Sequence, residues 1–288
     1  MNNRVWILTT VFNRAYTLPK YFSNIEKQTY KNYKLVIIDH GNKTIDKRTL
    51  PFYVVYVKST PDKWWTGAVN DGLKHIFNSE KVLDDDFIML QNDDVEFNEF
   101  LIEDLVNASA DNDAVIGAIT LDIDSKIIVD ADNRFSILKA KHICENRGKT
   151  LDEIGNQLLP SDILKGRGVI YPVKVVKEIG YLDERLNRRS DPEWGYRAKK
   201  AGYNIFIDPK ILVFTKVDTD VSLSNYVTFD KLKKYLFSPR STANLPDAIK
   251  YFYICSGFLK GTYSSIIYLF RLMIIILYKK IIQKGREK

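Results

Sequence analysis

The chain has 288 residues, of which 45% are apolar and 27% charged, an ordinary composition for a globular protein with a full core. Its net charge is +7, but the stretch from Lys231 to Lys288 holds 12 Lys or Arg and 2 Asp or Glu. A basic tail interleaved with Tyr, Phe and Ile suits an anionic membrane surface and argues against a nucleic-acid-binding face. Cys144 and Cys255 are too few for a disulfide scaffold. The N-terminus shows no secretory pattern, so we expect cytoplasmic residence.

Short β-rich runs alternate with helical stretches along the first part of the chain. The pattern predicts strands at 5–10, 35–39, 53–57, 87–90 and 114–120, and helices near 18–27, 67–77 and 97–108. Such alternation indicates an α/β fold with a mainly parallel sheet covered by helices on both faces. Ligands bind beyond the carboxyl ends of strands in these sheets. The residues to inspect are therefore Asn13, Arg14, Asp39 and 92–94.

Periodicity fades over 121–161, which predicts a long loop carrying a small hairpin. A turn at 166–168 then precedes a short helix to 179, and 191–201 predicts a helix ended by Gly202, a common C-cap residue. Strands at 205–207 and 211–214 complete the domain. We therefore predict one α/β domain over 1–215 and a C-terminal extension over 216–288, which begins with a connector through 238–240.

The C-terminal extension ends in an apolar stretch. Residues 266–278 are apolar except for Arg271, and Lys279, Lys280 and Lys284 follow. Thirteen residues fall short of the roughly 20 needed to cross a bilayer. The pattern predicts a helix lying in the membrane interface, with the protein peripheral on the inner face of the cell membrane. A helix packed on its own domain, or on a second subunit in a homodimer, is the alternative.

An acidic turn follows the predicted strand at 87–90. Asn92, Asp93 and Asp94 stand side by side there, and adjacent acids become useful if a divalent cation lies between them and a diphosphate. Mg²⁺ and Mn²⁺ favour oxygen ligands and neutralise charge that develops on a departing nucleotide diphosphate. A solvated turn is the alternative, because Asn and Asp are ordinary turn residues.

A second acidic pair, Asp191 and Glu193, begins a predicted helix. Ser190 with Glu193 fits a capping box, and Pro192 suits a first helical turn. This structural account explains why Ser190, Pro192 and Glu193 stand at these positions, but it gives less reason for Asp191. It is a candidate general base for an acceptor hydroxyl, provided that burial or Glu193 adjusts its pKa.

Asp39 and the segment 64–68 are further candidates for ligand binding, and each also has a purely structural explanation. Asp39 could accept hydrogen bonds from a base or ribose, or simply end a strand. The segment 64–68 could offer aromatic surface and close backbone approach to a sugar or phosphate, or pack in the core. The histidines His40, His75 and His142 show no metal spacing and receive no role.

Five segments, in this order, resemble glycosyltransferase family 2, whose fold is the Rossmann-like nucleotide-diphospho-sugar transferase (GT-A) fold. They are ILTTVFNR, QTYKNY with VIID, WWTGAVNDG, GRGV with IGYLDER, and DPEWGYRAKKAGY. The third resembles a segment common among bacterial members, including rhamnosyltransferases. The resemblance covers roughly residues 4–215.

The resemblance implies an inverting transfer of a sugar from a nucleotide-diphosphate donor to a glycan hydroxyl. Asp191 would be the base with Glu193 assisting, and Asp94 with Asn92 would hold Mg²⁺ or Mn²⁺. The implied nucleotide-binding residues are Thr10, Phe12, Asn13, Arg14, Asp39, Trp65, Gly67, Asn70 and Asp93. The implied acceptor-binding residues are Gly166, Arg167, Gly168 and Trp194. Asn92 departs from the family's usual Asp-x-Asp, and Thr215-Lys216 stands where many members carry a metal-binding His.

The basic, apolar tail extends this expectation to the acceptor. A lipid-linked glycan on the cytoplasmic leaflet, as in bacterial surface polysaccharide assembly, would suit a membrane-associated enzyme. A nucleotidyltransferase of similar fold is one rival, although no glycine-rich, basic triphosphate loop follows the first strand. A non-catalytic glycan-binding scaffold is the other.

Overall fold

The computed structural model describes residues 3–216, 229–239, 241 and 243–286, with side chains in the last range up to Lys279. Its contacts divide the chain into two compact units. The larger comprises Met1–Arg134, Cys144–Glu184 and Ser190–Val217, and the smaller Phe135–Ile143, Arg185–Arg189 and Asp218–Lys288. Of the connector predicted at 216–240, residues 217–228 and 240 lie outside the described ranges, and the described part is mostly helical, as α6 (Phe229–Phe237).

The larger unit is built on a sheet with the strand order β10-β12-β6-β11-β4-β1-β2-β3. Its parallel pairs join β1 (Val5–Val11) to β2 (Tyr33–Asp39) and β4 (Phe87–Leu90), β2 to β3 (Val54–Lys58), and β6 (Ala114–Asp122) to β12 (Asn204–Thr215). Strand β11 (Val169–Pro172) runs antiparallel between β4 and β6. Three short antiparallel strands, β5 (Val95–Phe97), β7 (Ile128–Asp130) and β10 (Leu159–Pro160), pair with β12 or β6.

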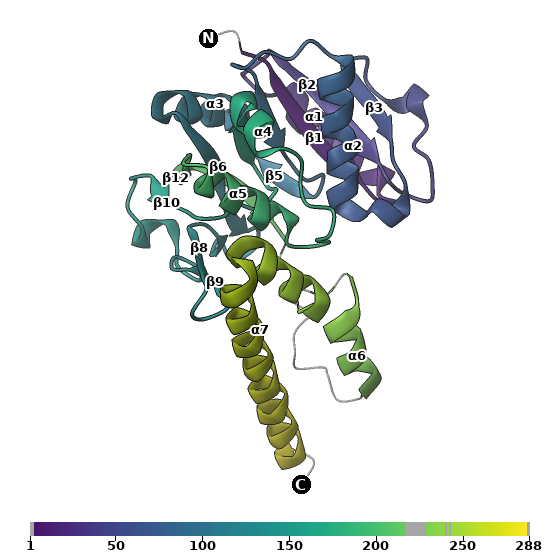
Figure 1. Cartoon of the computed structure of the whole chain (residues 1–288). Coiled ribbons are helices and arrows are strands. Elements are labelled where there is room, and N and C mark those ends of the chain that lie inside the picture. Colours follow the sequence, from purple (N-terminus) through teal and green to yellow (C-terminus); the bar gives the residue numbers. More distant parts are fainter. Residues whose placement is uncertain (1–2, 217–228, 240, 242, 287–288) are drawn as a thin grey trace. The chain divides into compact units, whose positions relative to one another are not determined.

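Helices cover both faces of this sheet (Figure 1). On one face lie α1 (Leu18–Glu26) and α3 (Leu101–Asn112), and on the other α2 (Trp64–Ser79), α4 (Val173–Ile179) and α5 (Ser190–Lys200). Successive residues of β1 alternate between the two cores: Trp6 and Leu8 join one, and Val5 and Ile7 the other. Burial on both faces explains why the strands at the centre of the sheet are mostly apolar. The α/β fold class predicted from the sequence is confirmed.

The structure changes the predicted boundaries in two places. The strands expected at 205–207 and 211–214 form the single strand β12, with an irregularity between Asp208 and Leu212. The helix expected from residue 97 begins later, because Val95–Phe97 pairs with β12 as β5. The hairpin expected within 121–161 is present as the pair β8 (Asn133–Ser136) and β9 (Lys141–Cys144).

The smaller unit contains α6 (Phe229–Phe237) and α7 (Leu245–Arg286), and α7 is broken at Gly257 (φ 73°). By length and composition, the described part of α7 up to Lys279 is sufficient to cross a membrane. Two hydroxyl groups within α7 are paired inside the helix. Thr262 and Ser265 donate hydrogen bonds to the carbonyls of Phe258 and Gly261, one turn earlier.

Candidate active site

The acidic turn after β4 is held by an arginine from the loop after β1. Arg14 donates to Asp93 Oδ1 at 2.5 Å and to Asp94 Oδ2 at 2.8 Å, and Thr17 donates to Asp93 Oδ2 at 2.9 Å. The Asp93 side chain is fully buried, whereas the Asp94 side chain is 44% exposed. Burial raises the pKa of Asp93, and the Arg14 charge opposes that rise. One guanidinium thus counters the repulsion between two adjacent carboxylates.

The same geometry shows which atoms are open to a metal. Both Asp93 oxygens are used within the protein, but Asp94 Oδ1 and the partly exposed Asn92 side chain have no partner among the described residues. No three His, Cys, Asp or Glu side chains gather as a metal site in the described part of the chain. One open carboxylate and an amide oxygen fit a Mg²⁺ or Mn²⁺ ion whose other ligands are phosphate and water.

The loops after β1 and β2 pack closely against each other. The Asn13 backbone is left-handed (φ 55°), and its Oδ1 accepts a hydrogen bond from the Lys43 amide at 3.1 Å. A Cβ on Gly41 would lie 2.7 Å from Asn13 Oδ1, so only glycine allows this approach. The rings of Phe12 and His40 pack against each other, with their centroids 5.1 Å apart. Burial lowers the pKa of His40 to about 4, which leaves this imidazole neutral at pH 7.

Asp39, at the end of β2, has a fully buried side chain. Its carboxylate accepts hydrogen bonds from the amides of Gly41 and Ile45, both at 3.0 Å, from the Tyr56 hydroxyl at 2.8 Å, and from Lys58 Nζ at 3.1 Å. Burial alone would raise its pKa, but these donors outweigh burial and lower it. In this structure Asp39 therefore organises the loop that follows β2.

We expect Asp39→Asn to destabilise the protein by about 2 kcal/mol, because an amide group would face donors that now meet a carboxylate. Since the folded pKa is depressed, the wild-type stabilisation is present above the unfolded pKa and is lost as pH falls through the folded value. Urea denaturation at several pH values measures both effects. Exposed Asp85→Asn is the control, and equal stability of the two variants would contradict the expectation.

Three of the residues predicted to bind the nucleotide, Trp65, Gly67 and Asn70, lie in the first two turns of α2. The indole of Trp65 packs against Gly166, where an added Cβ would lie 2.9 Å from Trp65 Cζ2. Gly67 is buried beneath Lys63, whose Cβ would lie 2.8 Å from a Cβ at Gly67. The buried amide of Asn70 donates to the Leu182 carbonyl and to Glu184 Oε1, both at 2.9 Å. Asn70 thus uses both amide hydrogens to connect α2 with the loop after α4.

Asp191 lies in the first turn of α5, where its carboxylate is partly exposed. The Gly166 amide donates to Asp191 Oδ2 at 3.0 Å, and Ser190, beside it, shares a 2.7 Å hydrogen bond with Thr66 of α2. Burial raises the pKa of Asp191 to about 6, although the Gly166 amide and the charges of Lys165 and Arg167 act in the opposite direction. A carboxyl group with this pKa is suited to accept a proton near neutral pH.

Glu193 and Trp194 hold α5 in place. Glu193 is buried and forms a bidentate ion pair with Arg197, with N–O distances of 2.9 and 2.8 Å. Arg197 also donates to the carbonyls of Ile179 and Tyr181. Trp194 is fully buried and donates from Nε1 to the Gly180 carbonyl at 2.8 Å.

The glycine turn before β11 brings the acidic turn and α5 together. Gly168 is left-handed (φ 68°), and its amide donates to the Leu90 carbonyl at the end of β4 at 3.1 Å. Between the two glycines, the partly exposed Arg167 side chain makes no hydrogen bond within the described residues. Its guanidinium is therefore open to an anionic or hydroxyl-bearing ligand beside Asp191.

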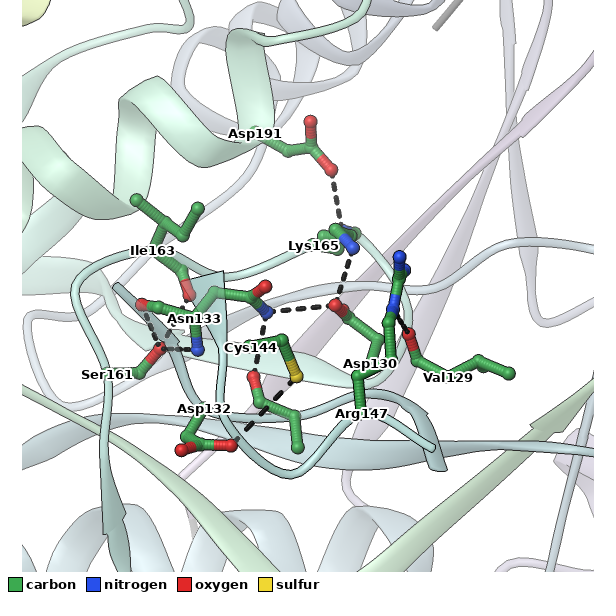
Figure 2. A network of polar contacts seen from close by, with 12 residues as sticks. Val129, Asp130, Asp132, Asn133, Cys144, Arg147, Ser161, Ile163, Lys165 and Asp191 are labelled. Atoms are coloured by element: carbon green, nitrogen blue, oxygen red, sulfur yellow. Dashed lines mark hydrogen bonds and ion pairs between the residues drawn. The ribbon is translucent and has the colours of Figure 1, made fainter. Parts of the chain in front are cut away.

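A polar network next to Asp191 was not predicted from the sequence. In Figure 2, Lys165 lies between Asp191 and Asp130, and Lys165 donates to Asp130 Oδ1. Asp130 is buried and also accepts a hydrogen bond from the Asn133 amide at 2.8 Å. Asp130 lies in the stretch interpreted as a loop, about 60 positions from Asp191 in sequence, so no local pattern connects it with the candidate base.

Comparison with known proteins shows the family to which the chain belongs. The model of Glycosyl transferase family 2 matches residues 6–177. This chain belongs to glycosyltransferase family 2. Its fold is the GT-A fold, and the family resemblance noted in the sequence is confirmed. A comparison with curated proteins gave no match.

Two solved structures share the fold of this family 2 member. GalNAc-T7, crystallised with UDP, GalNAc and Mn²⁺, is 16% identical with a TM-score of 0.58, and the alignment covers 81% of this chain and 47% of that one. TarS of S. aureus is 13% identical with a TM-score of 0.52, covering 74% and 37%. The chain thus spans less than half the length of either structure, and at these identities the likeness concerns the fold.

Proposed function

We propose that this family 2 enzyme transfers a sugar, with inversion, from a nucleotide-diphosphate donor to a hydroxyl of a glycan acceptor. The observation that carries the proposal is the Asp191 carboxylate, with a pKa of about 6, at the start of α5 and beside the open Arg167. A single displacement at the anomeric carbon needs one base on the acceptor side and charge neutralisation on the leaving-group side. The acidic turn after β4 is the candidate for the second requirement.

On the acceptor side, Asp191 removes the proton of the attacking hydroxyl. The Gly166 amide orients the carboxylate through Oδ2, which leaves Oδ1 for the hydroxyl. Arg167 would orient the acceptor, together with the backbone of the glycine turn. Glu193 assists the base indirectly, because its ion pair with Arg197 fixes the first turn of α5.

On the donor side, Asp94 and Asn92 would hold Mg²⁺ or Mn²⁺. When bound, this ion supplies positive charge to the departing diphosphate. Arg14 neutralises Asp93 and one oxygen of Asp94, which leaves a single carboxylate oxygen for the ion. The loops of Thr10 to Arg14 and of Asp39 to Lys43 line the proposed nucleotide site.

For the acceptor we propose a lipid-linked glycan of bacterial surface polysaccharide assembly, reached by a cytoplasmic enzyme bound to the inner face of the membrane. In support, α7 carries a stripe of exposed apolar side chains, including Ile266 (60% exposed), Phe270 (55%) and Ile274 (48%). Water-exposed apolar surface of this extent marks a membrane or protein contact. A homodimer through α7 is the competing arrangement.

Incubation with a panel of nucleotide sugars tests the activity. We expect nucleoside diphosphate release from one sugar nucleotide, stimulated by a lipid-linked acceptor. Release of pyrophosphate from a nucleoside triphosphate would instead support the nucleotidyltransferase alternative. Absence of any product with every donor and with lipid-linked acceptors would favour a glycan-binding scaffold.

Membrane binding is tested with Ile266→Ser/Phe270→Ser/Ile274→Ser, which removes the apolar stripe. We expect the variant to lose vesicle binding by about a hundredfold, since each side chain is about half exposed and contributes about 1 kcal/mol on burial. Phe52→Ser/Leu83→Ser, at exposed positions of the larger unit, is the matched control. Unchanged vesicle binding, or conversion of a dimer to a monomer without vesicle binding in the wild type, would refute the membrane role.

A further inference from the structure

Lys165 stands between two carboxylates from distant parts of the larger unit (Figure 2). It precedes the glycine turn, whereas Asp130 ends β7 and Asp191 lies in the first turn of α5. The Lys165 ammonium donates to Asp130 Oδ1, and it lies close enough for its charge to act on Asp191. No ion pair joins Lys165 to Asp191, although the structure describes both side chains. The lysine thus acts on two acids and is bound to one of them.

Asp130 holds this lysine from a buried position. Its side chain is 9% exposed, compared with 29% for the side chain of Lys165. The amide group of Asn133 donates to the same oxygen, Asp130 Oδ1, at 2.8 Å. Asn133 is itself fixed, because its backbone N–H donates to Ser161 Oγ at 3.0 Å. A buried carboxylate without a cation is strongly unfavourable, so the fold keeps Lys165 on Asp130.

One oxygen of the Asp191 carboxylate stays open in this arrangement. The Gly166 amide donates to Oδ2 at 3.0 Å, and Oδ1 has no partner among the described residues. Besides Lys165, the charged or titratable groups beside Asp191 are Arg167 of the turn, Tyr171 of β11 and Glu193 of its own helix. Glu193 is paired with Arg197, and burial raises the pKa of Tyr171, which leaves that phenol neutral.

The pairing of Lys165 determines whether Asp191 Oδ1 can accept a proton. A lysine carries its charge on a flexible four-carbon stem, so loss of the Asp130 charge would let the ammonium turn toward the other carboxylate beside it. An ammonium bound at Oδ1 would occupy the atom that has to receive the proton. It would also favour the charged form of the carboxylate and make it a weaker base.

We propose that Asp130 is a positioning residue, which holds Lys165 away from Asp191 and so keeps Asp191 Oδ1 open for the acceptor hydroxyl. Asp130 acts only through Lys165 and has no contact with the reacting atoms. The inference rests on the proposed role of Asp191 as the base. It adds a residue about 60 positions away in sequence that decides how available this base is.

Asp130→Asn tests the proposal, because it removes the charge but keeps the size of the side chain and an oxygen for Asn133. The acidic limb of the kcat profile should move about one pH unit lower, as expected when a carboxylate gains a nearby cation. The plateau of kcat should fall about tenfold, because the hydroxyl must displace Lys165 from Oδ1. Adding Lys165→Met removes the competing cation, so the double variant should return to nearly the wild-type plateau and limb.

Asp132→Asn is the matched control for the loss of a buried carboxylate. Asp132 is 4% exposed and lies two positions from Asp130, but it accepts hydrogen bonds from Asn146 and not from Lys165. The control may lose stability and should keep the acidic limb of the wild type. An unshifted limb in Asp130→Asn, or failure of Lys165→Met to rescue it, would leave Asp130 with a purely structural role and overturn the proposal.

NMR titration of the protein with isotope-labelled aspartate carboxyl groups measures the same pKa without substrate. The Asp191 resonance is assigned from its loss in Asp191→Asn. The pKa of Asp191, about 6 in the wild type because of burial, should fall in Asp130→Asn and rise again in the double variant. An unchanged value would reject the positioning role and leave the proposed function intact. Normal turnover by Asp191→Asn would reject Asp191 as the base, and the positioning role with it.

Discussion

Asp191→Asn is expected to lower kcat by about 10³-fold, within the range of 10²–10⁴ that a general base contributes. The amide cannot accept the acceptor's proton, but it keeps the size of the carboxyl group and one oxygen for the Gly166 amide. Nucleotide affinity should stay close to that of the wild type, because the proposed nucleotide loops follow β1 and β2. Steady-state kinetics and calorimetric titration with nucleoside diphosphate measure the two quantities.

Exposed Asp152→Asn is the control for this substitution and should turn over normally. Near-normal turnover by Asp191→Asn would remove Asp191 from the role of base. An equal loss of kcat and of nucleotide affinity would point to a damaged fold.

The pH dependence of the wild-type enzyme should report the same group. Burial raises the pKa of Asp191 to about 6, and a base must be deprotonated, so kcat should rise with pH through about 6 and level off about one unit higher. Arg167 lowers this pKa. Arg167→Gln should therefore shift the acidic limb of the kcat profile to higher pH, and an unshifted limb would show that another group is titrating.

Asp94→Ala is expected to reduce activity by about 10³-fold, the several kcal/mol that a metal ion supplies to a leaving group. Asp94 offers the only partly exposed carboxylate of the acidic turn, so its loss removes the one charged ligand proposed for the ion. Wild-type activity should disappear with a chelator and return with Mg²⁺ or Mn²⁺. The variant should need far more metal or stay inactive.

The neighbouring Asp93→Asn is the matched control. Because Asp93 is buried and bound to Arg14 and Thr17, its substitution should lower stability and leave the metal concentration for half-maximal activity unchanged. Full wild-type activity in the presence of chelator would reject the metal. In that case Arg14 would be the cation next to the leaving group.

Much of the fold could be predicted from local pattern. The strand at Phe87–Leu90 was predicted with its observed bounds, because four consecutive apolar residues end at a polar turn. The hairpin within 121–161 and the helix that ends before Gly202 were also anticipated, since turn and cap residues act over a few positions. The two misjudged segments, β5 and the continuous β12, depend on each other, because their pairing is between distant parts of the chain.

For the candidate site, the sequence indicated which residue types stand at the strand ends but not how they are paired. Arg14 was expected to bind the nucleotide, whereas in the structure it forms ion pairs with Asp93 and Asp94. Trp194 was expected to bind the acceptor and Asn70 the nucleotide. In the structure both donate hydrogen bonds to backbone carbonyls of the protein.

The sequence by itself determined the α/β class, the family, and the positions of the two acidic clusters, because each depends on residues close together in the chain. Only the tertiary structure decided that Asp93 is buried while Asp94 is open and that Lys165 stands between Asp191 and Asp130. Burial and charge pairing are set here by neighbours distant in sequence, 79 positions apart for Arg14 and Asp93 and 35 for Lys165 and Asp130. Such neighbours leave no local pattern, so the folded chain was needed to find them.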